Sequence, residues 1–470
     1  MSPHRSDITK IVCTIGPAST SPDVIRKLML AGMNVARLNF SHGKHEEHAR
    51  TVATIRGLAE ELRKPIAILG DLQGPRIRIG MLKEPRAIAE GDAFVFAPEA
   101  IAREGEIPVT YDDIAKDVRN GGTILVDDGL LAFAVTGIDG PRVAVRVRYG
   151  GQLKSNKGMN LPGIDVSAPS LTEKDRADIP FAIAHDLEYL ALSFVRRPED
   201  IEELRALLPK GMLIVAKIEK DSALERIEEI LRVSDAVMVA RGDLGVELPF
   251  EEVPLQQKRI IGLAARYGRP VITATQMLES MVQHPRPTRA EASDVANAIL
   301  DGTDAVMLSA ETAAGLHPVL AVEAMRRIAN AAEQAEVTRG QGLDRVIAGS
   351  ASVEETIASA SVTAVRLLGA ETIVVFTKSG FSARIVAARR PNVRIVVLTD
   401  NPRTYRQMAM VWGVIPFIVP HCDTYEQMVS LARQKLREHG LAKPGERIVV
   451  TAGVPFDVPG TTNQLKVETV

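Results

Sequence analysis

The sequence predicts an α/β protein with a closed parallel barrel of eight strand–helix units, an all-β domain inserted into that barrel, and a second, open α/β domain. Three observations lead to this prediction. Eight short apolar runs alternate with stretches of helical spacing, which is typical of buried parallel strands joined by helices. A stretch of alternating apolar and polar residues interrupts the third unit, and a new series of apolar runs begins near residue 372.

The barrel strands are expected at the eight apolar runs, and the segments between them, such as 198–208 and 256–267, have the length and spacing of helices. Eight such units predict a (β/α)8, or TIM, barrel surrounded by helices. Nearly every run ends in polar residues, at the end where such barrels carry their chemistry. The expected strands are residues 10–16, 34–40, 65–71, 189–194, 213–219, 236–243, 270–276 and 305–311.

Residues 75–168 are predicted to form the inserted domain, a small β-barrel able to act as a lid. Its short alternating strands are separated by turn signals such as Asp127-Asp128-Gly129. The catalytic barrel then comprises residues 1–74 and 169–336. Strands of the inserted domain are expected at 94–97, 124–126, 131–135 and 143–149.

Residues 337–470 are predicted to form the open α/β domain, which is a normal size for one domain. A long helix, roughly 318–335, leads to it through a polar connection. Apolar runs then alternate with helical stretches, and an edge strand is expected at 465–470. The other strands are expected at 372–377, 394–399, 414–419 and 447–452.

The composition excludes several classes of function. With 46% apolar and 25% charged residues and a net charge of −2, the chain is typical of a soluble globular protein without a basic footprint for nucleic acid or an anionic membrane. Cys13 and Cys422 form neither a disulfide framework nor a metal-ligand spacing. No signal-peptide core and no membrane-length apolar run is present, so we expect a cytoplasmic protein.

Two predicted strand ends each carry a cation and a carboxylate two residues apart: Lys217 with Glu219, and Arg241 with Asp243. Side chains at this spacing share one face of a strand. Buried charges are costly unless they are paired or bind a metal. Carboxylates without nearby His or Cys ligands favour Mg²⁺ or Mn²⁺. The alternative is a pair of structural salt bridges at the barrel rim, and Arg241 is expected to orient the site by pairing.

Other strand ends contribute candidates of the same kind. Arg37, Asn39 and Ser41 share one face after the second run, and arginine suits recognition of phosphate or carboxylate. The alternative is a hydrogen-bonded cluster at the strand end. Asp71 closes the third run and Arg78 follows it, where the alternative is a local ion pair.

Lys217 has two possible chemical roles. It could form a Schiff base, as in a barrel aldolase, which requires a lowered pKa. It could instead stay charged and stabilise a phosphoryl group in transfer. Glu219 on the same face favours the charged form.

A second anion site is expected in the last domain. Residues 377–382 follow its first strand and open a helix, and their hydroxyls, glycine and free N–H groups form an anion-binding cup. The alternative is an ordinary helix N-cap turn. The residues that build the cup are Thr377, Lys378, Ser379, Gly380 and Ser382.

These motifs together resemble those of pyruvate kinases over essentially the whole chain. The resemblance implies transfer of a phosphoryl group from phosphoenolpyruvate to ADP, after which enolpyruvate gains a proton and becomes pyruvate. It also suggests a homotetramer. The motifs are KIVCTIGPAS (10–19), MNVARLNFSHG (33–43), AKIE (216–219), ARGDLGVE (240–247), ATQMLESM (274–281) and PTRAE (287–291).

The resemblance also implies roles for single residues. Arg37 would contact the phosphoryl group, Lys217 would stabilise it in transfer, and Glu219 and Asp243 would hold Mg²⁺ or Mn²⁺. The inserted domain would close over the nucleotide and exclude water.

The remaining site residues are also carried over from matching motifs. The Gly242 backbone and Thr275 would bind the carboxylate region of the substrate, and Thr275 borders the face from which the proton arrives. Nucleotide contacts would come from Asn39, His42, Arg78 and Lys157. The family's potassium site matches Asn39, Ser41, Asp71 and the Leu72 carbonyl.

One departure from the family pattern concerns potassium. Many members read DTKGPEIRT where this chain reads DLQGPRIRI at 71–79, so Arg76 replaces the usual glutamate, as a lysine does in members that work without potassium. A fixed cation near an anionic site can supply the charge of a bound K⁺. We therefore predict that K⁺ is dispensable. The alternative is that Arg76 lies only at the hinge of the inserted domain and K⁺ still binds.

The cup at 377–382 matches the phosphate-binding loop of the family's effector site. The final loop, residues 453–463, lacks an arginine or lysine for a second phosphate. This favours a sugar monophosphate or nucleotide monophosphate as activator over a bisphosphate. Two alternatives remain for the whole chain: an aldolase using Lys217, and a catalytically inactive metabolite sensor. A sensor would be expected to lack Arg37, Lys217, Glu219 or Asp243, and all four are present.

Overall fold

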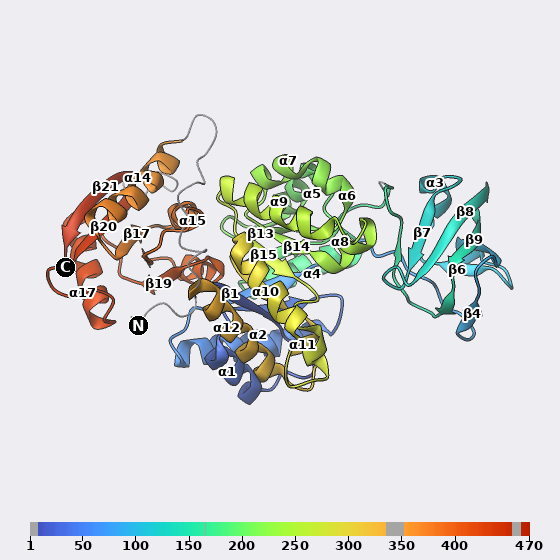
Figure 1. The fold of residues 1–470 in the computed structure, drawn as a ribbon, viewed down its shortest axis with the longest axis horizontal. Helices are drawn as coiled ribbons and strands as arrows, with labels where there is room; N and C mark the ends of the chain where they lie inside the picture. Colours follow the sequence, from blue (N-terminus) through green and yellow to red (C-terminus); the bar gives the residue numbers. More distant parts are fainter. Residues whose placement is uncertain (1–7, 165, 335–351, 454–461) are drawn as a thin grey trace.

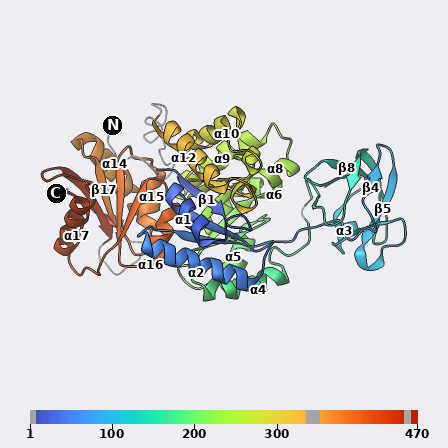
Figure 2. The same ribbon diagram turned by 90° about the horizontal axis from the view of Figure 1, so that it is seen from below.

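The computed structural model describes residues 8–164, 166–334, 352–453 and 462–470. Three bodies follow one another along the long axis of the molecule, with the barrel in the middle (Figure 1). The inserted domain lies beyond one end of the barrel and the C-terminal domain beyond the other, and the view from below shows the same order (Figure 2).

The central body is a closed barrel of eight parallel strands, so the predicted fold is confirmed. Alternate residues such as Val12, Val35, Tyr189 and Met238 point inward and fill the barrel, as the period of two along a strand requires. Around the ring, the strands are β1 (Lys10–Thr14), β2 (Val35–Asn39), β3 (Ala67–Asp71), β12 (Tyr189–Leu192), β13 (Leu213–Ile218), β14 (Ala236–Ala240), β15 (Val271–Ala274) and β16 (Ala305–Leu308).

Helices pack around this barrel, and their apolar faces form the largest described hydrophobic cluster with the outward side chains of the strands. Capping boxes at Thr172 and Thr288 satisfy free N–H groups at two helix starts. The longer helices are α1 (Pro22–Ala31), α2 (His45–Glu61), α4 (Glu173–Ala184), α5 (Pro198–Leu207), α7 (Ile227–Val233), α9 (Val253–Arg266), α10 (Arg289–Asp301) and α12 (Pro318–Gln334); the shorter ones are α6 (Asp221–Glu225), η2 (Glu279–Val282) and α11 (Ala310–Ala313).

Several strands end a few residues earlier than predicted, and for β14 the difference affects the candidate site. Strand β14 stops at Ala240, and helix α8 (Arg241–Glu247) begins at the next residue. The expectation that Arg241 and Asp243 share one face of a strand is therefore wrong. The physical reason is that Leu244 and Glu247 are both buried, and this spacing of three suits a helix rather than a strand.

The inserted domain has a core of its own, built around residues such as Phe96, Phe133 and Val145. Its hydrogen-bonded ladders form a six-stranded sheet in the order β11-β7-β8-β9-β5-β6 and a two-stranded sheet, β10-β4. The strands are β4 (Arg86–Ile88), β5 (Ala93–Pro98), β6 (Ile107–Val109), β7 (Thr123–Val126), β8 (Leu131–Asp139), β9 (Arg142–Tyr149), β10 (Gly151–Leu153) and β11 (Met159–Asn160), with short helices η1 (Glu99–Ile101) and α3 (Ile114–Asp117).

The C-terminal domain is the expected open α/β domain, with the strand order β19-β18-β17-β20-β21. Strand β21 runs antiparallel to β20, and the other neighbouring strands are parallel. The elements are α14 (Val353–Leu368), β17 (Thr372–Phe376), α15 (Phe381–Ala388), β18 (Arg394–Thr399), α16 (Pro402–Gln407), η3 (Met408–Met410), β19 (Val414–Ile418), α17 (Tyr425–Glu438), β20 (Arg447–Gly453) and β21 (Thr462–Thr469).

The short helix η3 joins this domain to the barrel. Ala409 and Met410 are buried and belong to the same hydrophobic cluster as the residues that fill the barrel. The Tyr189 hydroxyl, at the start of β12, donates to the Gln407 carbonyl at 2.8 Å. The C-terminal domain therefore covers the end of the barrel at which the strands begin. Among the described residues, no helix has both the length and the apolarity needed to cross a membrane.

Candidate active site

Charged side chains gather at the carboxyl ends of β2, β3 and β13, the end that faces the inserted domain. The Asp71 carboxylate accepts from Arg37 Nε at 2.6 Å and lies 3.3 Å from Lys217 Nζ. Lys217 also lies 2.9 Å from Glu219 Oε1. The structure therefore brings together four of the residues that the sequence predicts, from three strands that are far apart in the chain.

Burial opposes the charges on Asp71 and Lys217, and the opposite charges around each of them outweigh this effect. Although burial raises it, the pKa of Asp71 is held below its ordinary value by Lys217 and Arg37. Burial likewise opposes the charge on Lys217, but Asp71 and Glu219 raise the pKa of Lys217 above its ordinary value. Lys217 is therefore a cation, which suits stabilisation of an anion and not Schiff-base chemistry.

Glu219 has the properties of a ligand for a hard cation. Its Oε2 accepts from the Phe194 backbone N–H at 2.7 Å, which fixes the orientation of the carboxylate. Burial and the nearby negative charge of Asp243 both raise the pKa of Glu219. Two carboxylates that repel each other at a buried site are stabilised by a cation between them, and an all-oxygen donor set fits Mg²⁺ or Mn²⁺.

Ser193 is a site residue that the sequence reasoning missed. Lys217 Nζ donates to its hydroxyl at 2.7 Å, and that hydroxyl donates to the Leu72 carbonyl at 2.7 Å. Ser193 directly follows strand β12. The rule that singled out other polar strand ends could have found it.

Thr275 occupies a strained position at the end of β15. Thr275 and Gln276 have φ values of 67° and 54°, a left-handed conformation that is costly for a β-branched residue and that clusters at functional sites. The Gly242 N–H donates to Thr275 Oγ1 at 2.7 Å. The start of α8 and the end of β15 are thus joined where the substrate's carboxylate is expected to bind.

Arg241, the first residue of α8, connects this part of the site to α10. Its guanidinium donates to the Thr275 carbonyl at 2.8 Å and pairs with Asp294 at 2.7 Å. It therefore pairs, as expected, but with a carboxylate on α10 and not with Asp243. The role of Asp294 could not be predicted from the sequence, because an acidic residue within a helical stretch gives no indication of which distant cation it pairs with.

The residues of the expected potassium site lie close together. Asn39 and Asp71 are opposite each other in the register of β2 and β3, and Asn39 Oδ1 accepts from the Ser41 N–H at 3.1 Å. The Leu72 carbonyl accepts from Ser193. The Asp71 carboxylate is already paired with Arg37 and Lys217, so a bound cation would share it with two fixed positive charges.

The expected nucleotide contacts are divided between two domains. His42 and Asn39 belong to the barrel, whereas Arg78 donates to the Asn156 carbonyl at 2.8 Å and Lys157 pairs with Asp127 at 2.7 Å within the inserted domain. Partial burial, followed by the positive charges of Arg76, Arg78 and Arg37, lowers the pKa of His42. Arg76 is exposed, and its charge reaches His42 in the barrel, across the boundary between the two domains.

The expected effector cup has the backbone of a helix start. Gly380 has a φ of 76° and precedes α15, and its N–H donates to Thr377 Oγ1 at 3.0 Å. Lys378 lies 3.7 Å from Asp400, and the Ser382 hydroxyl is hydrogen-bonded to that of Thr462. Most of the final loop, residues 454–461, lies outside the described residues.

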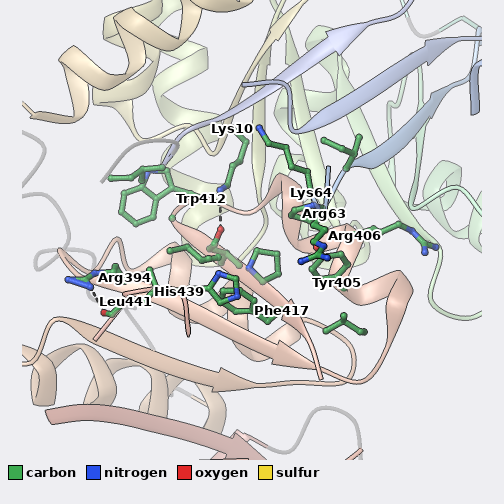
Figure 3. A pocket seen from close by; sticks show the side chains of 18 of the residues that line it. Lys10, Arg63, Lys64, Arg394, Tyr405, Arg406, Trp412, Phe417, His439 and Leu441 are labelled. Carbon is green, nitrogen blue, oxygen red and sulfur yellow. Dashed lines mark hydrogen bonds between the residues drawn. The ribbon is translucent and has the colours of Figure 1, made fainter. Parts of the chain in front are cut away.

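A cleft of about 1180 Å³ lies at the opposite end of the barrel, between the barrel and the C-terminal domain (Figure 3). Many of the residues that line the cleft are lysines or arginines. Some of them connect the two domains, as when Lys10 Nζ donates to the Val414 carbonyl at 3.1 Å. The predicted catalytic residues do not line this cleft. Its size therefore does not identify the catalytic centre.

Comparison with known proteins decides the family. The model of the pyruvate kinase barrel domain matches residues 6–322, and that of the pyruvate kinase alpha/beta domain matches residues 355–468. This chain belongs to the pyruvate kinase family. Pyruvate kinases are phosphotransferases, so the chain is an enzyme of that class.

Individual pyruvate kinases are similar over almost the whole chain. The chain is 47% identical to the pyruvate kinase of Geobacillus stearothermophilus and 46% identical to that of Staphylococcus haemolyticus (strain JCSC1435), in each case over 98% of this chain and 80% of the relative. A crystal structure of a pyruvate kinase from Cryptosporidium parvum superposes with a TM-score of 0.94 at 34% identity, covering 98% of this chain and 96% of that one.

Proposed function

We propose that this chain transfers the phosphoryl group of phosphoenolpyruvate to ADP, giving pyruvate and ATP in glycolysis. The observation that carries the proposal is the buried cation Lys217, held between Asp71 and Glu219 beside Asp243. Phosphoryl transfer requires positive charge around the transferring group, and a charged lysine next to two carboxylates that can bind a divalent ion meets this requirement.

Arg37 and Lys217 bind the phosphoryl oxygens and stabilise their charge as the group moves. The bond between phosphorus and the enol oxygen breaks, and a bond from phosphorus to an oxygen of the ADP β-phosphate forms. Mg²⁺ or Mn²⁺ held by Glu219 and Asp243 supplies electrostatic stabilisation of the transferring group.

The Gly242 N–H and Thr275 orient the carboxylate of the substrate, so that the enolate stays in place after transfer. The enolate then accepts a proton at its terminal carbon and becomes pyruvate. The inserted domain carries Arg78 and Lys157 toward the nucleotide, and its closure excludes water that would otherwise take the phosphoryl group.

A coupled assay with phosphoenolpyruvate, ADP and Mg²⁺ tests this proposal. Lys217→Met is expected to lower kcat by about a thousandfold or more, because a cation aimed at the transferring charge is lost. Lys27→Met is the control, because Lys27 is exposed on α1 and pairs with the exposed Asp23. An unmodified chain without this activity, or a Lys217→Met variant with full activity, would contradict the proposal.

We further propose that K⁺ is dispensable, because Arg76 supplies a fixed positive charge. Two observations support this: Arg76 lines a small cavity with Asp243, and its charge contributes to the lowered pKa of His42. An activator with a single phosphate is proposed for the cup at 377–382, supported by the hydroxyls and the left-handed Gly380 that open α15. Assembly as a homotetramer in the cytoplasm is proposed from family membership.

A further inference from the structure

A second buried ion pair lies behind the proposed metal site. Lys220 Nζ contacts Glu247 Oε1 at 2.6 Å, and the side chains are only 7% and 0% exposed. Lys220 directly follows Glu219 at the end of β13, and Glu247 is the last residue of α8, the helix that carries Asp243. The pair therefore joins the two elements that carry the two proposed metal ligands.

The inserted domain reaches the same carboxylate. Asn160, on the edge strand β11, donates from Nδ2 to Glu247 Oε1 at 3.0 Å. The turn between β7 and β8 approaches α8 as well, because a Cβ on Gly129 would lie 3.9 Å from Val246. Both ribbon views place α8 at the side of the barrel nearest the inserted domain (Figures 1 and 2).

The other oxygen of this carboxylate has no hydrogen-bond partner among the described residues. Glu247 Oε2 is buried, so the carboxylate depends on Lys220 and Asn160 at its other oxygen. A buried charge with so few partners is costly. Asn160, Lys220 and Asp243 also line a common cavity of about 70 Å³, so one member of the ion pair shares a cavity with a proposed metal ligand.

We propose that Lys220 and Glu247 are positioning residues that set α8 against β13, and that Asn160 docks the inserted domain on them. Docking then fixes the separation of Glu219 and Asp243 and raises the affinity for the divalent cation. The inference rests on the metal site of the proposed function. It deepens that function by making closure of the inserted domain and binding of the metal thermodynamically coupled, so that each favours the other.

The test is the affinity of the full-length protein for Mn²⁺, measured by electron paramagnetic resonance without substrates. Asn160→Ala is expected to weaken Mn²⁺ binding about five- to tenfold, which lies within the range for the loss of one ordinary hydrogen bond. At saturating Mn²⁺, kcat is expected to stay within about twofold of the unmodified value. Asn297→Ala, which changes an exposed asparagine on α10, is expected to leave the affinity unchanged.

A second variant separates positioning from folding. Glu247→Gln keeps hydrogen-bonding capacity toward Asn160 and Lys220 but leaves Lys220 without a counter-charge near the cation. We expect a larger loss of Mn²⁺ affinity than in Asn160→Ala, and faster hydrogen exchange of the α8 amides in both variants. A purely structural role would lower the yield or thermal stability without changing the affinity of the folded protein.

The outcomes distinguish this inference from the proposed function. Unchanged Mn²⁺ affinity in Asn160→Ala and Glu247→Gln, in an enzyme that turns over phosphoenolpyruvate, would overturn the inference alone. Weakened Mn²⁺ binding in both variants of a chain without that activity would support the inference and overturn the function. An unmodified protein that binds no Mn²⁺ would overturn both.

Discussion

Asp71 shows how one residue sets the electrostatics of the site. Its carboxylate is buried, yet it stays ionised because it lies between Arg37 and Lys217. The same contact helps to keep Lys217 charged. Asp71 therefore holds two cations close together at the proposed phosphoryl site.

We predict that Asp71→Asn shifts the alkaline limb of the pH–rate profile to lower pH. Asp71 raises the pKa of Lys217, so removing its charge lowers that pKa. Lys217 then loses its proton at a lower pH, and activity falls earlier as the pH rises. The measurement is kcat between pH 7 and 10 in constant salt. Asp23→Asn, on the exposed face of α1, is the control, and coincident profiles would contradict the argument.

The potassium prediction also belongs to one residue. The unmodified enzyme is expected to be fully active with tetramethylammonium as the only monovalent cation, because Arg76 supplies the charge. Arg76→Glu is expected to make the activity depend on added K⁺, whereas Arg86→Glu, at an exposed position in the inserted domain, is not. A large stimulation of the unmodified enzyme by K⁺ would refute the prediction.

At the level of elements, the barrel could be predicted because its strands are short apolar runs, nearly all of which end in polar residues. The pairing of Lys217 with Glu219 followed from that pattern. The start of α8 could not be predicted in the same way. The few residues that follow β14 fit either a strand or a helix, and only the burial of Leu244 and Glu247 distinguishes the two. Contacts such as Arg241 with Asp294 join distant segments, and no local pattern encodes them.

The start of α15 carries the effector prediction. A carboxylate at position 379 would occupy the anion cup and repel a phosphate, so Ser379→Asp is expected to abolish activation. Turnover at saturating substrate is expected to stay unchanged, because the cup lies in a separate domain from the catalytic residues. Activation by sugar and nucleotide monophosphates is the measurement, with Ser430→Asp, at an exposed position on α17, as the control. An unchanged response in Ser379→Asp would exclude the cup.

At the scale of the whole molecule, charged side chains hold the C-terminal domain to the barrel. Arg406, on α16, contacts both Asp186 and Glu188 at 2.5 Å, and Arg403 contacts Asp186 as well. Glu188 is fully buried and is also paired with Arg56 at 2.9 Å. The junction of the two domains therefore includes a carboxylate that needs cations from both sides.

We predict that Arg406→Met lowers the free energy of unfolding by about 2–4 kcal/mol, because a buried carboxylate loses one of its two cations. Calorimetric unfolding of the full chain measures the change. Arg437→Met, at an exposed position on α17, is expected to have an effect within about 0.5 kcal/mol. Equal melting curves for the two variants would show that the contact contributes little.

The helix η3 has a consequence for synthesis of the chain. Ala409 and Met410 complete the packing inside a barrel whose first strand begins at Lys10. A ribosome must therefore add about four hundred residues after that strand before the C-terminal domain can cover the end of the barrel at which the strands begin. Until then the apolar cluster inside the barrel lacks the side chains of Ala409 and Met410. Chaperones that shield apolar surface on nascent chains would therefore be needed longest at this end of the barrel.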